Sequence, residues 1–342
     1  MLPQHNFLLL DKVAFMRAEY LYLSIILFAF IALILVISML MIILHKKARL
    51  KIRSWISGQL EPWIMDIILE SNTDEGHLFE VPANLKILLQ GDAAKRILLR
   101  ELVNIKKSLS GLSGHNLEKV YSQLNLQQIS LKRIANKHWH IKAKGIQELA
   151  IMTQQGNSNM LFELTNDKDP MVRMEAQTAM VRLQGYKGLQ FFDNLTFPLS
   201  EWHQLNLLYL LGSQPITAEN GIFNWLHADN STVVQFSLKL IAEQHAIEFH
   251  EDVVKCLNHE SEVVRKAAII CLGQMPSNEA ATELQKLYAR EKDKNVKLCI
   301  IKELMQTGSD QDFPFLQTLQ HDGDVDIKLA ANKTVLYLKK IF

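Results

Sequence analysis

The chain has 342 residues, a formal net charge of +1 and 21% charged residues. A near-neutral balance argues against a general nucleic-acid binder, and 14 Gly and 8 Pro are few enough to favour long helices over many turns. The three cysteines, Cys256, Cys271 and Cys299, lie in helical patterns without a C-x-x-C pair, which indicates buried reduced thiols and suggests no disulfide framework.

The first predicted element is a transmembrane helix over residues 20–45, after a short extracytoplasmic N-terminus of residues 1–19. Residues 21–44 carry no charge, and 17 of these 24 are Leu, Ile, Val or Phe. At about 1.5 Å per residue the run is about 36 Å long, enough to cross about 30 Å of hydrocarbon. A signal peptide competes with this interpretation, but its apolar region spans about 7–15 residues and ends at a small-residue cleavage site. This run is longer and ends in His45, Lys46 and Lys47.

Flanking charges predict the orientation of that helix. Residues 45–53 carry five Lys or Arg and no acid, whereas the N-terminal side balances two basic residues with two acidic ones. Basic flanks stay in the cytosol. We therefore expect the N-terminus outside and everything after residue 45 inside.

Residues 46–70 form a basic and amphipathic juxtamembrane segment. Its apolar residues recur at helical spacing: Ile52, Trp55, Ile56 and Leu60. The segment either continues the membrane helix into the first packed helix of the next domain, or lies in the headgroup layer with Trp55 and Trp63 as anchors.

Residues 71–130 are predicted to form an irregular helical cap that belongs to the solenoid after it. They contain a helical pattern at 92–109, a Ser/Gly loop at 108–114 and a second helical pattern at about 116–124. The repeat motif that follows has no clean copy among them.

Residues 131–342 repeat one motif: an apolar residue, a long polar residue and, three places later, a mostly small or aliphatic residue. The pairs that open each copy are Ile141-Lys142, Val172-Arg173, Trp202-His203, Val234-Gln235, Val264-Arg265, Val296-Lys297 and Ile327-Lys328. Their polar positions lie 31, 30, 32, 30, 32 and 31 residues apart. The predicted caps of the motif helices are Asp169-Pro170, Ser200, Ser231, Ser261 and Asp322-Gly323-Asp324. Each unit reads as two helices that bury their apolar faces only by stacking on neighbouring units.

The turn residue, the Val-Arg pair and the small residue after it resemble the HEAT repeat, in its short variety of about thirty residues. The best copies are DPMVRMEAQTAM, from Asp169, and SEVVRKAAIICLG, from Ser261, while Trp202-His203 departs from the pattern. The resemblance implies an all-α fold: an N-terminal transmembrane helix followed by an α-α superhelix. The layout also resembles bacterial inner-membrane HEAT-repeat proteins, some of which accompany membrane glycosyltransferases.

Positive charge is concentrated in residues 84–144, with a net charge of +9, against −7 for residues 145–342. The candidate contact residues of this basic block are Lys95, Arg96, Arg100, Lys106, Lys107, Lys132 and Arg133. They form a solvated helical face, or they contact anionic lipid headgroups or an acidic partner beside the membrane. Nucleic acid is a poorer candidate, because interleaved aromatic residues are missing.

The basic residues of the motif recur in register and form a predicted ladder: Lys142, Arg173, Arg265, Lys297 and Lys328. These side chains bond to turn acids and carbonyls of neighbouring units, or they present a basic stripe to a partner.

The sequence shows no nucleotide-binding loop, no G-x-S-x-G and no paired cysteine ligands. A single His-Glu dipeptide, His259-Glu260, does not suffice for the di-iron site of HEAT-repeat hydroxylases. We therefore expect no enzyme activity, metal or cofactor. The expected function is a membrane-tethered scaffold for membrane-embedded or membrane-proximal proteins, with the solenoid in the cytoplasm. The alternative is a regulatory or catalytic subunit that acts on a membrane-bound substrate.

Overall fold

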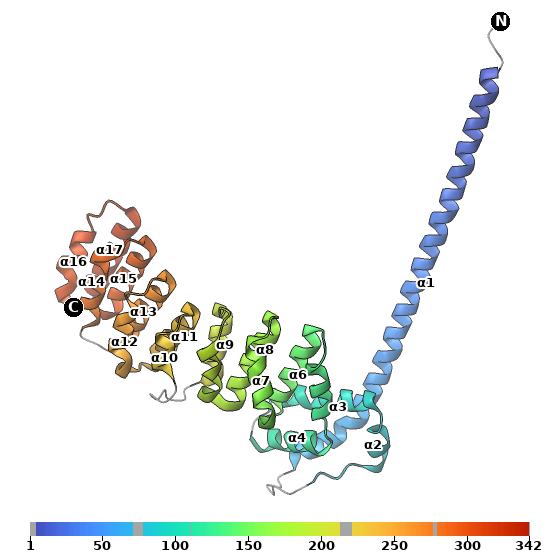
Figure 1. The fold of residues 1–342 in the computed structure, drawn as a ribbon, viewed down its shortest axis with the longest axis horizontal. Helices are drawn as coiled ribbons and strands as arrows, with labels where there is room; N and C mark the ends of the chain where they lie inside the picture. Colours follow the sequence, from blue (N-terminus) through green and yellow to red (C-terminus); the bar gives the residue numbers. More distant parts are fainter. Residues whose placement is uncertain (1–4, 71–77, 110, 213–220, 276–278, 342) are drawn as a thin grey trace. The chain divides into compact units, whose positions relative to one another are not determined.

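The computed structural model describes residues 5–70, 78–109, 111–212, 221–275 and 279–341 (Figure 1). These residues form α-helices, short 3-10 helices and turns, and no strand occurs among them. The chain divides into two compact units, residues 1–123 and 124–342.

The first unit is built on one long helix, α1 (His5–Leu69), which is uninterrupted over 65 residues. Its final turns bury Ile56, Leu60, Ile64 and Ile67, spaced three and four residues apart, against α3 (Asp92–Lys106) and α4 (Gly111–Gln123). The juxtamembrane segment therefore continues the apolar helix into the first packed helix, which is the first of the two alternatives.

Trp63 is not a headgroup anchor in this structure. Its ring is buried, and its Nε1 donates to the carbonyl of Glu80 at 2.9 Å. Trp55 lies next to the buried Ile56 but points away from the packed face, and it is 59% exposed. Of the two tryptophans, Trp55 thus keeps the exposure that an interfacial anchor needs.

Polar side chains fasten the end of α1 and the segment that follows it. Asn116 Nδ2 donates to the carbonyls of Ile67 and Glu70, each at 3.0 Å, which satisfies acceptors at the helix C-terminus. Gln123 pairs with both backbone groups of Phe79, at 3.0 and 2.8 Å. These bonds hold the entry to α2 (Ala83–Leu88) against α4.

The first compact unit contains most of the predicted cap, residues 71–130. The compact unit includes the last turns of α1, and it ends at residue 123, before α5 (Gln127–Ile134). The reason is that α5 packs on α6 (Trp139–Ile151) through Gly145, where an added Cβ would lie 2.6 Å from the Ser130 carbonyl oxygen. Helix α5 is thus the first helix of the first repeat.

The second unit is an array of helix pairs. The first helices of the remaining pairs are α7 (Ser158–Glu163), a 3-10 segment (Gly185–Asn194), α10 (Ile222–Leu226), α12 (His250–Cys256), α14 (Ala280–Arg290) and α16 (Phe313–Leu319). The second helices are α8 (Pro170–Gln184), α9 (Glu201–Leu211), α11 (Ser231–Gln244), α13 (Glu262–Gln274), α15 (Lys294–Thr307) and α17 (Val325–Leu338). Successive second helices lie side by side along the array, as Figure 1 shows for α13, α15 and α17.

Most second helices begin with a side-chain cap at or next to the predicted turn residue, whereas Ser261 occupies the cap position of α13 without a side-chain capping bond. Asp169, Ser200 and Asp324 accept hydrogen bonds from the first turns of α8, α9 and α17. The predicted cap of α11 was wrong by one residue. Asn230, not Ser231, accepts the Thr232 N–H at 3.1 Å, and the Asn230 amide also donates to two carbonyls of the preceding loop.

The third copy of the motif is displaced by one residue from its predicted position. In α9 the N–H of Gln204 bonds to the carbonyl of the cap Ser200, as the N–H of the ladder residue does in α6, α8, α13, α15 and α17. The copy is therefore His203-Gln204 followed by the buried Leu207. His203 occupies the buried position that valine fills in most other copies, and Trp202 points to solvent, 64% exposed.

Candidate functional site

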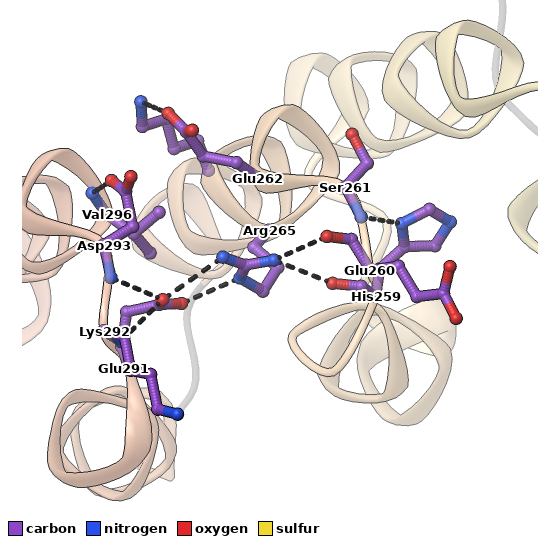
Figure 2. A network of polar contacts seen from close by, with 10 residues as sticks. His259, Glu260, Ser261, Glu262, Arg265, Glu291, Lys292, Asp293 and Val296 are labelled. Atoms are coloured by element: carbon purple, nitrogen blue, oxygen red, sulfur yellow. Dashed lines mark hydrogen bonds and ion pairs between the residues drawn. The ribbon is translucent and has the colours of Figure 1, made fainter.

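Arg265 connects three segments of the array (Figure 2). Its Nε and Nη2 donate to the carboxylate of Glu291 at 2.7 and 3.2 Å, and its Nη1 donates to the carbonyls of His259 and Glu260 at 3.0 and 2.9 Å. Glu291 also accepts the backbone N–H groups of the next two residues, each at 2.9 Å. Burial acts to raise the pKa of Glu291, but these donors outweigh it and hold that pKa below its usual value.

The earlier ladder residues make the same kinds of contact. Lys142 Nζ lies 3.0 Å from the carboxylate of Asp167, in the turn of the next unit. Arg173 donates to the carbonyls of Asp167 and Lys168 at 2.8 and 3.0 Å, and its guanidinium stacks 3.8 Å from the Phe197 ring centroid. These contacts favour the structural ladder over a basic stripe for the first three ladder residues.

The last two ladder residues, Lys297 and Lys328, make fewer polar contacts with neighbouring turns than the first three. Lys297 Nζ lies 5.0 Å from the ring centroid of Tyr288, and Lys328 is exposed on α17. These two ladder residues therefore present more of their charge to solvent than the first three.

Hydrogen bonds of glutamine and histidine side chains replace the ladder ion pairs between α8, α9 and α11. Gln177 donates to the Thr165 carbonyl at 2.9 Å, so its Oε1 is the acceptor for His203 Nε2, at 2.9 Å. Gln204 donates to Gln235 at 3.0 Å and accepts from Lys239 Nζ at 3.0 Å.

His203 is the most strongly perturbed titratable group of this chain of bonds. The residue is 3% exposed, and its Nδ1 has no hydrogen-bond partner among the described residues. Burial lowers the pKa of His203 to about 4, because the charged imidazolium would lose its hydration there. The imidazole is therefore neutral at physiological pH.

The basic block is divided by the structure. Lys132 and Arg133 belong to α5 in the second unit, and Arg133 pairs with the buried Glu148. In the first unit Arg100 pairs with Glu101 at 2.8 Å, and Lys106 pairs with Glu118 at 2.8 Å. The remaining candidates are exposed or half-buried and form no ion pair with another described residue: Lys95, Arg96 and Lys107. These three residues are therefore the remaining candidates in the first unit for contact with lipid headgroups or an acidic partner.

Helix α9 carries three exposed apolar side chains on one face, which we call the α9 stripe: Trp202, Leu205 and Tyr209. The three side chains are 64%, 60% and 83% exposed and recur three and four residues apart on one face of the helix. Exposed apolar residues on α13 are Val263 and Ile270. The sequence pattern missed the α9 stripe because Trp202 resembled a buried motif residue.

One cavity of about 450 Å³ lies between the turn after α10 and the turn after α12. Its lining includes His227, Asp229, His259 and Glu260. His259 Nδ1 accepts the N–H of the residue two places on at 3.0 Å, while His227 Nδ1 faces a carbonyl of its own helix at 2.9 Å, so each ring is oriented by its own backbone. Across the described residues, no group of three or more His, Cys, Asp and Glu side chains is arranged to hold a metal ion.

Comparisons with known proteins identify the repeats. Residues 251–334 match the family model for HEAT repeats. No curated protein matches the sequence significantly. The chain is an all-α, HEAT-like solenoid with a long apolar N-terminal helix, which confirms the predicted fold class.

Similar solved structures include Escherichia coli YibA, with 16% identity and a TM-score of 0.42 over 77% of this chain and 100% of that one. Human deoxyhypusine hydroxylase shares 12% identity, with a TM-score of 0.33 over 84% of this chain and 98% of that one. The phycocyanin lyase complex of Nostoc shares 13% identity, with a TM-score of 0.26 over 78% and 91% of the two chains. At these TM-scores the likenesses bear neither on the activity nor on the partners of this chain.

Proposed function

We propose that this protein is a membrane-tethered interaction scaffold that does not catalyse a reaction. It binds a membrane-embedded or membrane-proximal protein through exposed side chains of its second helices. The observation that carries the proposal is the α9 stripe. Trp and Tyr are among the side chains most enriched at binding hot spots, and large exposed apolar side chains on one helix face are typical of a protein interface.

The apolar part of α1 supports the tether. The side chains of residues 22–44 are largely exposed, so no other described part of the chain covers them. The seventeen Leu, Ile, Val and Phe residues among residues 21–44, at roughly 0.3–0.6 kcal/mol each, favour insertion by roughly 5–10 kcal/mol, an upper bound. Of the basic block, Lys95, Arg96 and Lys107 are then the residues of the first unit available to anionic lipid or to an acidic segment of the partner.

The first prediction concerns topology. A reporter fused after Phe342 should be cytosolic, because five basic residues follow the apolar run and resist translocation. Activity of a reporter that works only outside the cytosol would contradict the orientation.

A charge reversal tests the cause of that topology. Reversing Lys46, Lys47 and Arg49 to Glu should mix the two orientations, because the basic flank then no longer exceeds the N-terminal one. The same change at Lys339 and Lys340, far from the apolar run, is the control and should leave the reporter cytosolic.

The second prediction concerns the α9 stripe. Replacing Trp202 and Tyr209 by Ala in the full chain should weaken capture of its partner by about 30-fold for each truncation, and by up to about 1,000-fold for the two together, since each hot-spot truncation costs about 2 kcal/mol. Capture is measured by affinity purification from membranes in mild detergent and quantitative mass spectrometry. Both side chains are exposed, so the helical circular dichroism spectrum should not change.

The matched control replaces Val263 and Ile270, two exposed apolar residues of α13, by Ala. Proteins retained by this control and by the wild type, but lost from the stripe variant, are the expected partners. If the wild type, the stripe variant and the control variant all retain the same set of proteins, the proposal is wrong.

A further inference from the structure

We propose that α17, the last described helix of the array, is a self-association surface that binds α17 of a second copy in antiparallel orientation. The inference concerns a different surface from the α9 stripe and does not depend on the membrane tether.

Helix α17 is apolar on two opposite faces. One face is buried in the array through Ile327, Ala331, Thr334, Val335 and Leu338. At 100° per residue, Val325, Leu329 and Leu336 lie on the opposite face, where they are 66%, 60% and 64% exposed. We call these three residues the α17 stripe. Large apolar side chains that recur on one exposed helix face are typical of a surface that binds another protein.

Preceding second helices show what this face does inside the array. On α13 the residue at the Leu336 position is Gly273, where an added Cβ would lie 3.2 Å from the Glu303 Cβ of α15. This position therefore faces the next second helix. On α15 the residue at the Leu329 position is Leu298, which is half-buried. The Leu336 position thus packs within the array, and the Leu329 position is half-buried on α15, yet on α17 no other described part of the chain covers either leucine.

Val325 extends the stripe where the preceding helices are charged. At the first position after the cap, α13 carries Glu262 and α15 carries Lys294. An exposed valine in place of a charged side chain enlarges the open apolar surface of α17 by one further turn. The stripe therefore reaches from the first turn of the helix to its last.

The stripe is complementary to itself in antiparallel pairing. A two-fold axis between Asn332 and Lys333 places Leu329 of each copy beside Leu336 of the other, because both lie equally far from that axis. Two equivalent leucine contacts then form at the centre of the pair. Parallel pairing would place each leucine beside the same leucine of the other copy. It would also place the two acidic ends together and the two basic ends together, where like charges repel.

The charges at the two ends of the helix favour the same arrangement. The N-cap Asp324 and the first-turn Asp326 make the start of the helix acidic, and the last turn is followed by the exposed Lys339 and Lys340. Antiparallel pairing brings the acidic end of one copy to the basic end of the other. Asp326 already contacts Lys294 at 2.6 Å, yet its side chain remains 61% exposed and can accept a second ammonium group.

One helix pair buries less than the roughly 1,600 Å² of a standard stable interface, so the association is weak and is best detected by a covalent trap. The experiment uses the full chain with Leu329 and Leu336 both replaced by Cys, oxidised mildly in detergent and analysed on a non-reducing gel. We expect a disulfide-linked dimer, because the axes of packed helices lie about 8–10 Å apart, which brings the Cα atoms of facing positions into the range of about 4.4–6.8 Å that a disulfide requires.

Each single cysteine variant should remain monomeric, since like positions are separated by seven residues, or about 10 Å along the helix. The parent chain controls for Cys256, Cys271 and Cys299, of which the first two are buried. The pair Leu205→Cys and Tyr209→Cys on α9 controls for random collision of exposed thiols.

A second variant tests the pairing through a charge. The two Lys333 side chains approach near the axis and repel, so Lys333→Gln should increase cross-linking of the double cysteine chain several-fold. Dimer yields no higher than those of the α9 control, or equal yields from the single variants, would overturn the proposal. A dimer from the double variant alone, strengthened by Lys333→Gln, supports it.

Discussion

Replacing Arg265 by Met is expected to lower the free energy of unfolding of the array by about 3–5 kcal/mol. The Glu291 side chain is only 6% exposed, and the substitution leaves its carboxylate with backbone donors alone. It also removes the donor shared by the carbonyls of His259 and Glu260, which lie in the turn between the two helices of one pair. Urea denaturation of the full chain in detergent, followed by circular dichroism, measures the loss.

Lys266→Met is the matched control, since Lys266 pairs with Glu262 at the surface of the same helix and such pairs contribute about 0–1 kcal/mol. Adding Glu291→Gln to Arg265→Met should restore part of the stability, because the unpaired buried charge is then gone. If Arg265→Met is as mild as Lys266→Met, the Arg265 contacts contribute nothing beyond a surface pair.

The second large effect is an acid sensitivity that depends on His203. A folded-state pKa of about 4, against an ordinary value of 6.5, means that stability is fully present above pH 6.5 and is lost as the pH falls toward 4. Between pH 7.5 and pH 5 the unfolded chain takes up a proton that the folded chain does not. The loss from this one group is about 2 kcal/mol over that interval.

His203→Gln retains a hydrogen-bond donor for Gln177 and removes the titration, so the variant should lose about 2 kcal/mol less than the wild type between these two pH values. His227→Gln, a change to an exposed histidine, should leave the pH dependence of the wild type in place. Equal slopes for the wild type and His203→Gln would show that the buried imidazole is not the acid-sensitive group.

Much of the fold follows from the sequence because the repeat carries its own signals. The spacing of the motif, the capping residues and the uncharged run of residues 21–44 predict an apolar helix followed by stacked helix pairs, and the structure has this architecture. These signals are local, in that each depends on residues within one turn or one helix.

The parts that could not be predicted depend on contacts between distant residues. The third copy was misplaced because Trp202 is apolar, and the burial of His203 beside it shows which residue faces the core. Lys142 and Arg265 find their acids 25 and 26 residues later, in turns whose geometry sequence spacing does not define. A contact with a distant residue also removes Arg133 from the candidate contact residues, because it pairs with a buried glutamate of the following helix.

The uninterrupted course of α1 has a further consequence, which is rotational. No Gly or Pro occurs in residues 45–55, so the apolar run and the packed turns from Ile56 onward share one helical phase. Each residue inserted there would turn the packed helices of the first unit by about 100° and shift them by about 1.5 Å relative to the apolar run. Two inserted residues would rotate that unit by about 200° about the helix axis, relative to the apolar run. Seven would rotate it by about 700°, which returns it almost to its original orientation. The length of this segment therefore sets a direction as well as a distance.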